Sequence, residues 1–369
     1  MKAYERMKEI ELQLAGALRQ QLERIPSLEI RSIVAEAELR TNGSMRAQRP
    51  DVLAQVRIHN HEVTLVCEVK EPAYPRQIRQ AIDTLSLYIA RSENKALHES
   101  MVPLVAASWL SPESREICAG AGMGWLDLAG NCRIAFDGVF IERETAERPK
   151  PAARNYRAVF SPKAGQVLRT LLRDPARTWR VTELAEASDV SLGHVSNVRS
   201  ALRDREWGTV GEEGLHLTAP DALLDAWRDS YEPVRGKRTS WYSILHGRQW
   251  EETLREALWR PQTEGHAMLG GLSAAQWLAP YMRGNTTTLY ADTSVVPELI
   301  ETLKLKSTKS GANVEIIEPD DPAILKERVE IPGAPPVSSP VLTYLDLSQL
   351  DDRGREAADH LREKLLKWH

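Results

Sequence analysis

The spacing of apolar and polar residues along the N-terminal region predicts helices and strands in alternation. Lys2–Arg24 has the spacing of a helix, and Leu28–Arg40 fits either a helix or a strand. Two runs rich in Val, Ile and Leu, Asp51–Ile58 and Val63–Lys70, flank a short polar connection and predict a β-hairpin. The other expected elements are a helix at Gln77–Arg91, a buried strand at Val102–Trp109, a short helix at Pro112–Ala121 and a pair of strands within Trp125–Glu142. This order predicts a central sheet flanked by helices.

Three amphipathic segments and two short apolar runs follow in the middle of the chain. The helices are expected at Lys163–Arg173, Val181–Ala187 and Leu192–Asp204, and the strands at Trp207–Val210 and Gly214–Thr218. Ser191 is expected to cap the third helix, and the apolar side of that helix predicts four buried residues, Leu192, Val195, Val198 and Leu202. Three helices followed by a two-stranded wing are similar to the winged helix-turn-helix of DNA-binding regulators.

The C-terminal part of the chain alternates again between helices and strands. Strands are expected at Thr287–Tyr290, Asn313–Ile317 and Val341–Leu347, and helices at Gln249–Trp259, Ser273–Ala279, Val296–Leu305 and Asp352–Trp368. Asp292 and Asp346 fall at strand ends, where a single Asp usually belongs to a turn or a cap. No nucleophile–base spacing, glycine-rich phosphate loop or metal cluster stands out in this part of the sequence.

Two polar stretches, 142–154 and 231–240, interrupt the apolar pattern and are rich in charge and Pro. At 369 residues the chain is long enough for two or three domains. We therefore expect an α/β (α+β) multidomain protein with domains at 1–148, 157–230 and 240–369. The first would hold a mixed sheet flanked by helices, the second a winged helix and the third an α/β domain.

The charge of the whole chain does not indicate nucleic acid, but the charge of its middle part does. Lys and Arg number 48 against 52 Asp and Glu, which gives a net charge of -4. Residues 157–206 carry nine basic and six acidic side chains, about +3, so this region is locally positive. Three widely spaced cysteines without a CxxC pair argue against a disulfide scaffold or a zinc site and fit a reducing cytoplasm. No apolar run reaches the length of a membrane span.

The hairpin expected in the first domain would bring two carboxylates and an ammonium group together. If His59 and Asn60 form the turn, paired residue numbers add up to 119, which places Asp51 opposite Glu68. Side chains alternate along a strand, so Glu68 and Lys70 share one face. Because opposed carboxylates repel each other, a divalent cation such as Mg²⁺ would neutralise them and activate water, with Lys70 offsetting charge on a phosphoryl group.

Pro50-Asp51 followed by Glu68-Val69-Lys70 resembles the PD-(D/E)XK superfamily of restriction-endonuclease-like proteins, over about residues 29–142. The resemblance implies a DNA-cleaving site that uses Mg²⁺ or Mn²⁺, in which Asp51 and Glu68 bind the metal and Lys70 is catalytic. Two alternatives stay open. These side chains are solvated charges on a surface strand, or the domain binds DNA without cleaving it.

The same resemblance implies two further site residues on neighbouring helices. An acid from a preceding helix would be Glu36 or Glu38, with Glu38 the preferred metal ligand. A glutamine from the following helix would be Gln77 or Gln80, with Gln77 preferred as the catalytic residue.

Two other polar pairs in the first domain have both a structural and a functional interpretation. Asp127 and Asn131 bracket a Gly turn, and the sequence favours side chains that satisfy the backbone of that turn over residues at the rim of a nucleic-acid cleft. His59 and His61 form an HxH pair, for which a solvated hairpin tip is favoured over a metal site.

The third helix of the winged-helix region presents side chains suited to reading DNA. Short polar and basic residues hydrogen-bond base edges and phosphates. The expected DNA-binding residues are Ser191, His194, Ser196, Asn197, Arg199 and Arg203, with Ser200 on the same face. Winged helices also mediate protein contacts, and the acidic pair Glu212-Glu213 in the wing would repel phosphate.

Two stretches of the C-terminal part carry a second resemblance. They are Gly270–Ala275, with the sequence GGLSAA, and YLDL at Tyr344–Leu347 together with the charged helix that follows it. With the winged helix, they resemble the AbiEi family, the antitoxin and transcriptional regulator component of type IV toxin-antitoxin systems, over about residues 157–369. The resemblance implies binding to the protein's own promoter and a domain that counters a nucleotidyltransferase-like toxin without necessarily gripping it. The nuclease-like first domain departs from the simple family plan.

These observations favour a cytoplasmic, sequence-specific regulator that binds double-stranded DNA and has a cognate toxin as a partner. The alternative is an enzyme, in which the winged helix delivers a Mg²⁺-dependent endonuclease to DNA. A third hypothesis makes the C-terminal domain an interaction module for a partner protein or a second copy. A homodimer is expected by analogy, because winged-helix regulators often bind pseudo-palindromic sites as pairs.

Overall fold

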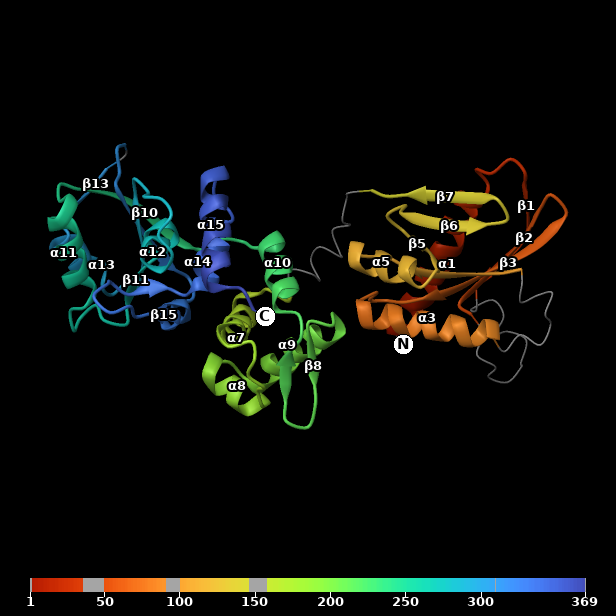
Figure 1. The fold of residues 1–369 in the computed structure, drawn as a ribbon, viewed down its shortest axis with the longest axis horizontal. Coiled ribbons are helices and arrows are strands. Elements are labelled where there is room, and N and C mark those ends of the chain that lie inside the picture. The colour runs from red at the N-terminus through yellow and green to blue at the C-terminus, as the bar shows by residue number, and fades with distance from the viewer. Residues whose placement is uncertain (1, 36–49, 91–99, 146–157, 309, 369) are drawn as a thin grey trace. The chain divides into compact units, whose positions relative to one another are not determined.

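The structure is a computed structural model that describes residues 2–35, 50–90, 100–145, 158–308 and 310–368. Figure 1 shows the chain as a ribbon. Its residues group into two compact units, Met1–Tyr156 with Ser200–Glu206, and Arg157–Arg199 with Trp207–His369. No helix among the described residues is long and apolar enough to cross a membrane.

The first unit is built on a seven-stranded mixed sheet in which neighbouring strands follow chain order. The strands are β1 (Leu28–Ala35), β2 (Val52–Ile58), β3 (His61–Val69), β4 (Met101–Ala107), β5 (Gly124–Asp127), β6 (Cys132–Phe136) and β7 (Val139–Arg143). The pairs β3–β4 and β4–β5 are parallel, and the others are antiparallel. The expected sheet flanked by helices is thus confirmed for this unit.

The hairpin of β2 and β3 has the predicted turn and register. His59 and Asn60 have φ of 47° and 90°, which places both turn residues in the left-handed region that a type I′ turn requires. Val52 pairs with Cys67 and Leu53 with Val66, so paired numbers add up to 119. The structure therefore confirms the predicted register as far as the pair of Val52 and Cys67, which is next to Asp51 and Glu68.

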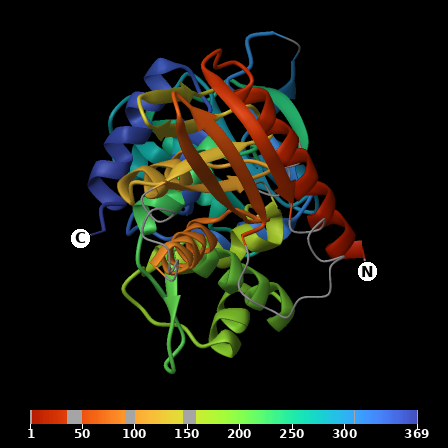
Figure 2. The same cartoon turned by 90° about the vertical axis from the view of Figure 1, so that its right-hand side faces the viewer.

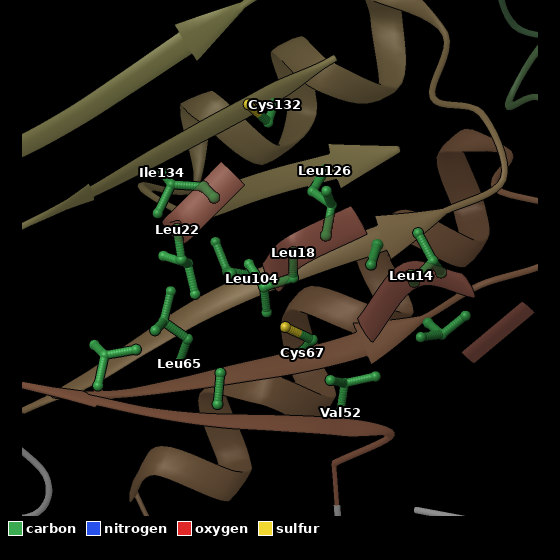
Figure 3. Close-up of a cluster of buried hydrophobic side chains, with 14 of the residues drawn as sticks. Leu14, Leu18, Leu22, Val52, Leu65, Cys67, Leu104, Leu126, Cys132 and Ile134 are labelled. Carbon is green, nitrogen blue, oxygen red and sulfur yellow. The ribbon is translucent and has the colours of Figure 1, made fainter. Parts of the chain in front are cut away.

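Helices cover both faces of this sheet. Leu14, Leu18 and Leu22 of α1 (Lys2–Leu22) pack on the face that carries Leu65 and Leu104, as Figure 3 shows. The helices α3 (Pro75–Ala90) and α5 (Pro112–Gly120) pack on the opposite face. Figure 2 shows α1 and α3 on opposite sides of the strands. Cys67, Cys118 and Cys132 are free and buried between these layers.

The second unit begins with segment 158–230, called the winged helix below because its elements follow the order expected of that fold; Ser200–Glu206, from the end of α9 onward, group with the first unit. Its elements are α7 (Pro162–Arg173), α8 (Val181–Ser188), α9 (Leu192–Asp204), β8 (Gly208–Val210), β9 (Leu215–Leu217) and α10 (Pro220–Ser230). Gly214 has φ of 136°, and a Cβ there would lie 2.2 Å from the Trp179 carbonyl oxygen, so only glycine fits where the wing meets the bridge between Trp179 and Leu215.

The apolar side of α9 differs from the prediction at one residue. Val195, Val198 and Leu202 are buried as expected, whereas Leu192 is 52% exposed. Leu192 is the first residue of the helix, so no earlier turn of α9 covers it. Ser191 fits the expected cap, because the His194 backbone N–H lies 3.4 Å from its Oγ.

The rest of the second unit is a seven-stranded sheet in the order β13-β10-β14-β12-β11-β16-β15. The strands are β10 (Gly236–Ser243), β11 (Ala267–Leu269), β12 (Thr287–Ala291), β13 (Leu305–Ser307), β14 (Val314–Pro319), β15 (Arg328–Val329) and β16 (Val337–Ser338). The helices are α11 (Gly247–Leu258), α12 (Gly271–Leu278), α13 (Val296–Thr302), the 3₁₀ helix η2 (Pro322–Glu327), α14 (Pro340–Leu347) and α15 (Asp352–Leu365).

Three segments differ from their predicted structure. Val341–Leu347 was expected to be a strand but lies in α14, because an apolar run that is buried on all sides has no periodicity to separate helix from strand. Half of the expected 231–240 linker belongs to β10, which lies inside the sheet between β13 and β14. The region Trp125–Glu142 forms three strands, β5 to β7, instead of two.

The winged helix and the C-terminal sheet share several ion pairs within the second unit. Arg169 of α7 pairs with Glu327 of η2, and both side chains are buried. Lys326 Nζ lies 2.5 Å from Asp189 Oδ2 in the turn between α8 and α9. Arg362 of α15 contacts two acidic side chains of α10, Asp221 and Asp225. These contacts attach the C-terminal sheet domain to the winged helix through α7, α10 and the turn before α9.

Candidate functional site

The structure brings Asp51, Glu68 and Lys70 together at the end of the β2–β3 hairpin. Asp51 Oδ2 accepts a 2.6 Å hydrogen bond from the Val69 backbone N–H. Lys70 Nζ lies 2.6 Å from Glu68 Oε1. The Glu68 side chain is buried, and that of Lys70 is partly buried. The three predicted residues are therefore neighbours, and Lys70 balances the charge of one of the two carboxylates.

The second carboxylate, Asp51, lies in surroundings that disfavour its negative charge. Burial raises the pKa of Asp51 to about 7, with a further increase from the negative charge of Glu68, against the lowering effect of the Val69 N–H. A group with a pKa of about 7 is only half ionised at neutral pH. A bound cation would favour its ionised form, so the site has the electrostatics that a divalent ion would relieve.

Glu11 on α1 is a third acid close to this site, and the sequence prediction missed it. Its charge contributes to the raised pKa of Asp51. Glu11 is buried on the same side of α1 as Leu14 and Leu18. A carboxylate at helical spacing with buried leucines is a signal that was available in the sequence. Glu36 and Glu38, which were expected to supply this acid, lie outside the described residues.

Gln77 is the more suitable of the two expected glutamines. It lies in the first turn of α3, which follows β3 after a short connection. Its amide oxygen is buried without a hydrogen-bond partner among the residues that the structure describes. Gln80 is exposed. A buried acceptor without a partner is unfavourable by about 1 to 3 kcal/mol, so a hydrogen bond from a ligand or a water molecule to this oxygen would be favourable.

The described residues contain no set of three His, Cys, Asp or Glu side chains placed to hold a metal ion. Mg²⁺ often binds through only one or two carboxylates and keeps several waters, so Asp51 and Glu68 fit the smallest such site. His59 and His61 are exposed at the hairpin tip and fit the solvated interpretation.

The side chain of Asp127, together with Asn131, stabilises the turn that the two residues flank. The carboxylate of Asp127 accepts hydrogen bonds from the Leu110 backbone N–H, the Ala129 backbone N–H and the Asn131 side chain. Both Asp127 and Asn131 are fully buried. The favoured structural interpretation fits these contacts, and a place for the two side chains at the rim of a cleft does not.

The outer face of α9 carries the predicted DNA-binding side chains. Ser191, His194, Ser196, Asn197 and Arg203 are exposed, and Arg199 is partly buried. Ser191 Oγ lies 3.0 Å from His194 Nδ1. Arg203 pairs with the neighbouring Asp204. The face therefore combines hydroxyl, amide, imidazole and guanidinium groups on one solvent-facing helix.

Part of the chain matches the model of a known protein family. Residues 216–367 match the family described as the transcriptional regulator and AbiEi antitoxin of type IV toxin-antitoxin systems. The match begins in β9 and extends past α15, so it confirms the AbiEi resemblance for the C-terminal part of the chain. No curated protein and no solved structure matches the chain.

Proposed function

We propose that the protein is a transcriptional regulator of the antitoxin type that binds specific double-stranded DNA through α9. The observation that carries this proposal is the exposed polar face of α9, held on a winged helix whose neighbour matches the AbiEi family. In winged helix-turn-helix proteins the corresponding helix enters the major groove.

The chemistry of this face fits base recognition. Asn197 would hydrogen-bond an adenine edge, and Arg199 a guanine edge or a phosphate. Glu212 and Glu213 at the tip of the wing are exposed and would repel phosphate, so we assign the specific contacts to α9 alone. We further propose that the protein acts in the cytoplasm, that a toxin is its cognate partner and that it binds its operator as a homodimer.

The test is a gel mobility shift with DNA from upstream of the protein's own gene and with a scrambled fragment of equal length. Asn197→Ala should weaken specific binding by about 1 to 3 kcal/mol and leave binding to the scrambled fragment nearly unchanged. Arg199→Ala should also reduce the salt dependence of binding by about one counterion if Arg199 contacts phosphate. Arg248→Ala, which removes an exposed arginine from α11, is the matched control.

Two outcomes would contradict the proposal. If wild type binds both fragments equally, the protein is not sequence-specific. If Asn197→Ala and Arg199→Ala both bind like Arg248→Ala, α9 does not contact DNA.

A second candidate function is metal-dependent cleavage of a phosphodiester by the first unit. Asp51, Glu68 and Lys70 are adjacent, and the buried amide oxygen of Gln77 has no partner among the described residues. The sheet order and the hairpin are consistent with the PD-(D/E)XK resemblance. This candidate adds a DNA-cleaving activity to a chain whose winged helix would deliver it to DNA.

Each side chain has a distinct task in this candidate. Mg²⁺ or Mn²⁺, when bound, would supply Lewis-acid chemistry and make water a better nucleophile. Asp51 and Glu68 would hold the ion, and Glu11 is placed to add negative charge nearby. Lys70 would stabilise charge that develops on a phosphate oxygen, and Gln77 would orient a water molecule.

The test incubates end-labelled duplex DNA with the protein in Mn²⁺ and, separately, in EDTA. Shortened strands should appear only with metal and should be absent with Lys70→Ala. The Lys70→Ala variant should still shift the DNA fragment that the wild type binds through α9. Glu62→Gln, at the exposed far end of the same hairpin, is the control. Intact DNA under both conditions would rule out cleavage of this duplex by the purified protein and leave the regulator proposal in place.

A further inference from the structure

An open groove of about 1110 Å³ lies on one face of the C-terminal sheet. Strands β10, β14 and β12 form its floor, and residues at the start of α12 and the end of α14 line its sides. The opposite face of this sheet is buried under α11 and α13. None of its lining residues belongs to the α9 surface or to the Asp51 cluster, and neither candidate function uses it.

Cationic and hydrogen-bonding groups gather on one side of the groove. Arg235 and Arg238 lie at and beside the start of β10. Arg238 Nη1 is 3.4 Å from Glu315 Oε1, and Arg235 Nη2 is 2.7 Å from Glu232 Oε2. A guanidinium has five N–H donors, so each of these contacts leaves further donors for a ligand. Ser240 and Thr288 add hydroxyl groups beside them.

Apolar side chains line another part of the groove. They are Leu272, Ile317 and Leu350, and the Leu350 side chain is 40% exposed. An exposed apolar side chain beside arginines favours a ligand that has both an apolar surface and a negative charge.

Two acidic side chains line the groove, Glu315, which pairs with Arg238, and Asp346. Asp346 accepts 2.7 Å hydrogen bonds from the hydroxyl groups of Tyr231 and Tyr290. Burial raises the pKa of Asp346 to about 6, so the group stays mostly ionised at neutral pH, with its charge stabilised by the two tyrosine hydroxyl groups. Gly270 makes room for this arrangement, since a Cβ there would lie 2.4 Å from the Tyr290 ring. Asp346 therefore fixes Tyr290, and both of its carboxylate oxygens already accept hydrogen bonds from tyrosine hydroxyl groups.

We propose that this groove binds a nucleoside phosphate, with the phosphate on Arg235 and Arg238 and the base on the apolar side chains. Guanidinium groups match phosphate oxygens in charge and geometry. A bare anion would leave most of a groove of 1110 Å³ unfilled, whereas a nucleotide would occupy both its charged and its apolar parts.

The experiment is a calorimetric titration of the full-length protein at low salt with the 5′-monophosphates of adenosine, guanosine, cytidine and uridine. Inorganic phosphate and the four free nucleosides are titrated in parallel. At least one nucleotide should bind more tightly than phosphate and than its own nucleoside, because only the nucleotide uses both parts of the groove.

Variants assign the binding to this groove. Arg238→Ala should weaken nucleotide binding by about tenfold or more, since a hydrogen bond to a charged group contributes about 1.5 to 3 kcal/mol. Lys237→Ala is the matched control, because Lys237 is the adjacent residue of β10 and pairs with Glu318, which does not line the groove. Arg238→Lys keeps the charge but loses the planar fork, and we expect intermediate affinity. It also shows whether loss of binding in Arg238→Ala reflects misfolding.

Four results would overturn the proposal. The first is no binding of any of the four nucleotides at about 1 mM. The second and third are phosphate binding as tightly as the best nucleotide, and a nucleoside binding as tightly as its nucleotide. The fourth is equal nucleotide affinity of Arg238→Ala and Lys237→Ala. Each can be observed whether or not the protein binds DNA, so failure here is distinguishable from failure of the proposed regulator function.

Discussion

The buried ion pair between Arg169 and Glu327 joins the C-terminal domain to the winged helix, and its contribution to stability can be predicted. Each side chain is only 9% exposed. Burial raises the pKa of Glu327 even though Arg169 opposes the shift, so the carboxylate has lost much of its hydration. Glu327→Ala would leave the Arg169 guanidinium buried without its carboxylate, beside the ring of Trp227.

The expected loss of stability is large because the remaining charge cannot reach water. Removing one partner of a buried ion pair lowers the free energy of unfolding by about 3 to 5 kcal/mol. The neighbouring Lys326→Ala removes a pair that also joins the C-terminal domain to the winged helix, but its side chains are 68% and 65% exposed. An exposed pair contributes about 0 to 1 kcal/mol. Comparing the two variants therefore distinguishes the effect of a buried unpaired charge from the effect of losing an ion pair.

The assay is urea unfolding followed by tryptophan fluorescence, in which buried Trp207 and Trp227 report on the winged helix. Glu327→Ala should lower the midpoint much more than Lys326→Ala, at an unchanged denaturant dependence. The double variant Arg169→Met/Glu327→Leu should recover most of the loss, because it leaves no unpaired charge. Equal effects of Glu327→Ala and Lys326→Ala would refute the reasoning.

Two further substitutions test the electrostatics of the hairpin and the strain of the wing. Folding raises the pKa of Asp51 from the ordinary value of 3.8 to about 7, so the protonated group favours the folded state. This contribution to stability is complete below about pH 4 and is lost as the pH rises through 7. Asp51→Asn should therefore raise the free energy of unfolding at pH 8 by roughly 2 to 4 kcal/mol and change it little at pH 4, and an equal effect at both pH values in urea titrations would contradict this. Gly214→Ala should lower stability by about 1 to 3 kcal/mol, because φ of 136° strains alanine and its Cβ would meet the Trp179 carbonyl oxygen. A melting temperature within 1 °C of wild type would be incompatible with that contact, since about 1 kcal/mol shifts the melting temperature of a unit of this size by about 2 to 4 °C.

Local signals predicted the β2–β3 hairpin well. Its turn uses His59 and Asn60, a polar pair between two β-branched runs, and the turn type fixes the register that puts Asp51 next to Glu68. Register follows from local geometry, so a sequence can specify it without knowledge of the rest of the fold. The same reasoning placed Lys70, which directly follows β3, on the side of Glu68, and its Nζ lies 2.6 Å from Glu68 Oε1.

Elements that depend on tertiary surroundings were predicted less well. Val341–Leu347 forms a helix because the domain buries it on every side, and its own apolar sequence fits a strand equally. Asp346 therefore lies within a helix between two tyrosines, where a strand end had been expected. Glu11 comes close to Asp51 only because α1 folds across the sheet, which no spacing within α1 specifies.

The cluster around Asp51 allows metal binding to be tested separately from cleavage. The negative charges of Glu68 and Glu11 add to the burial that raises the pKa of Asp51, so ionised Asp51 disfavours the folded protein at neutral pH. A cation that binds only the folded state stabilises it by RT ln(1 + [L]/Kd), which is about 1.4 kcal/mol at tenfold excess over Kd. We therefore expect Mn²⁺ to raise the melting temperature at pH 8 and to have little effect on Asp51→Asn. If Mn²⁺ shifts wild type and Asp51→Asn alike, the ion binds elsewhere, and the carboxylates are not a metal site.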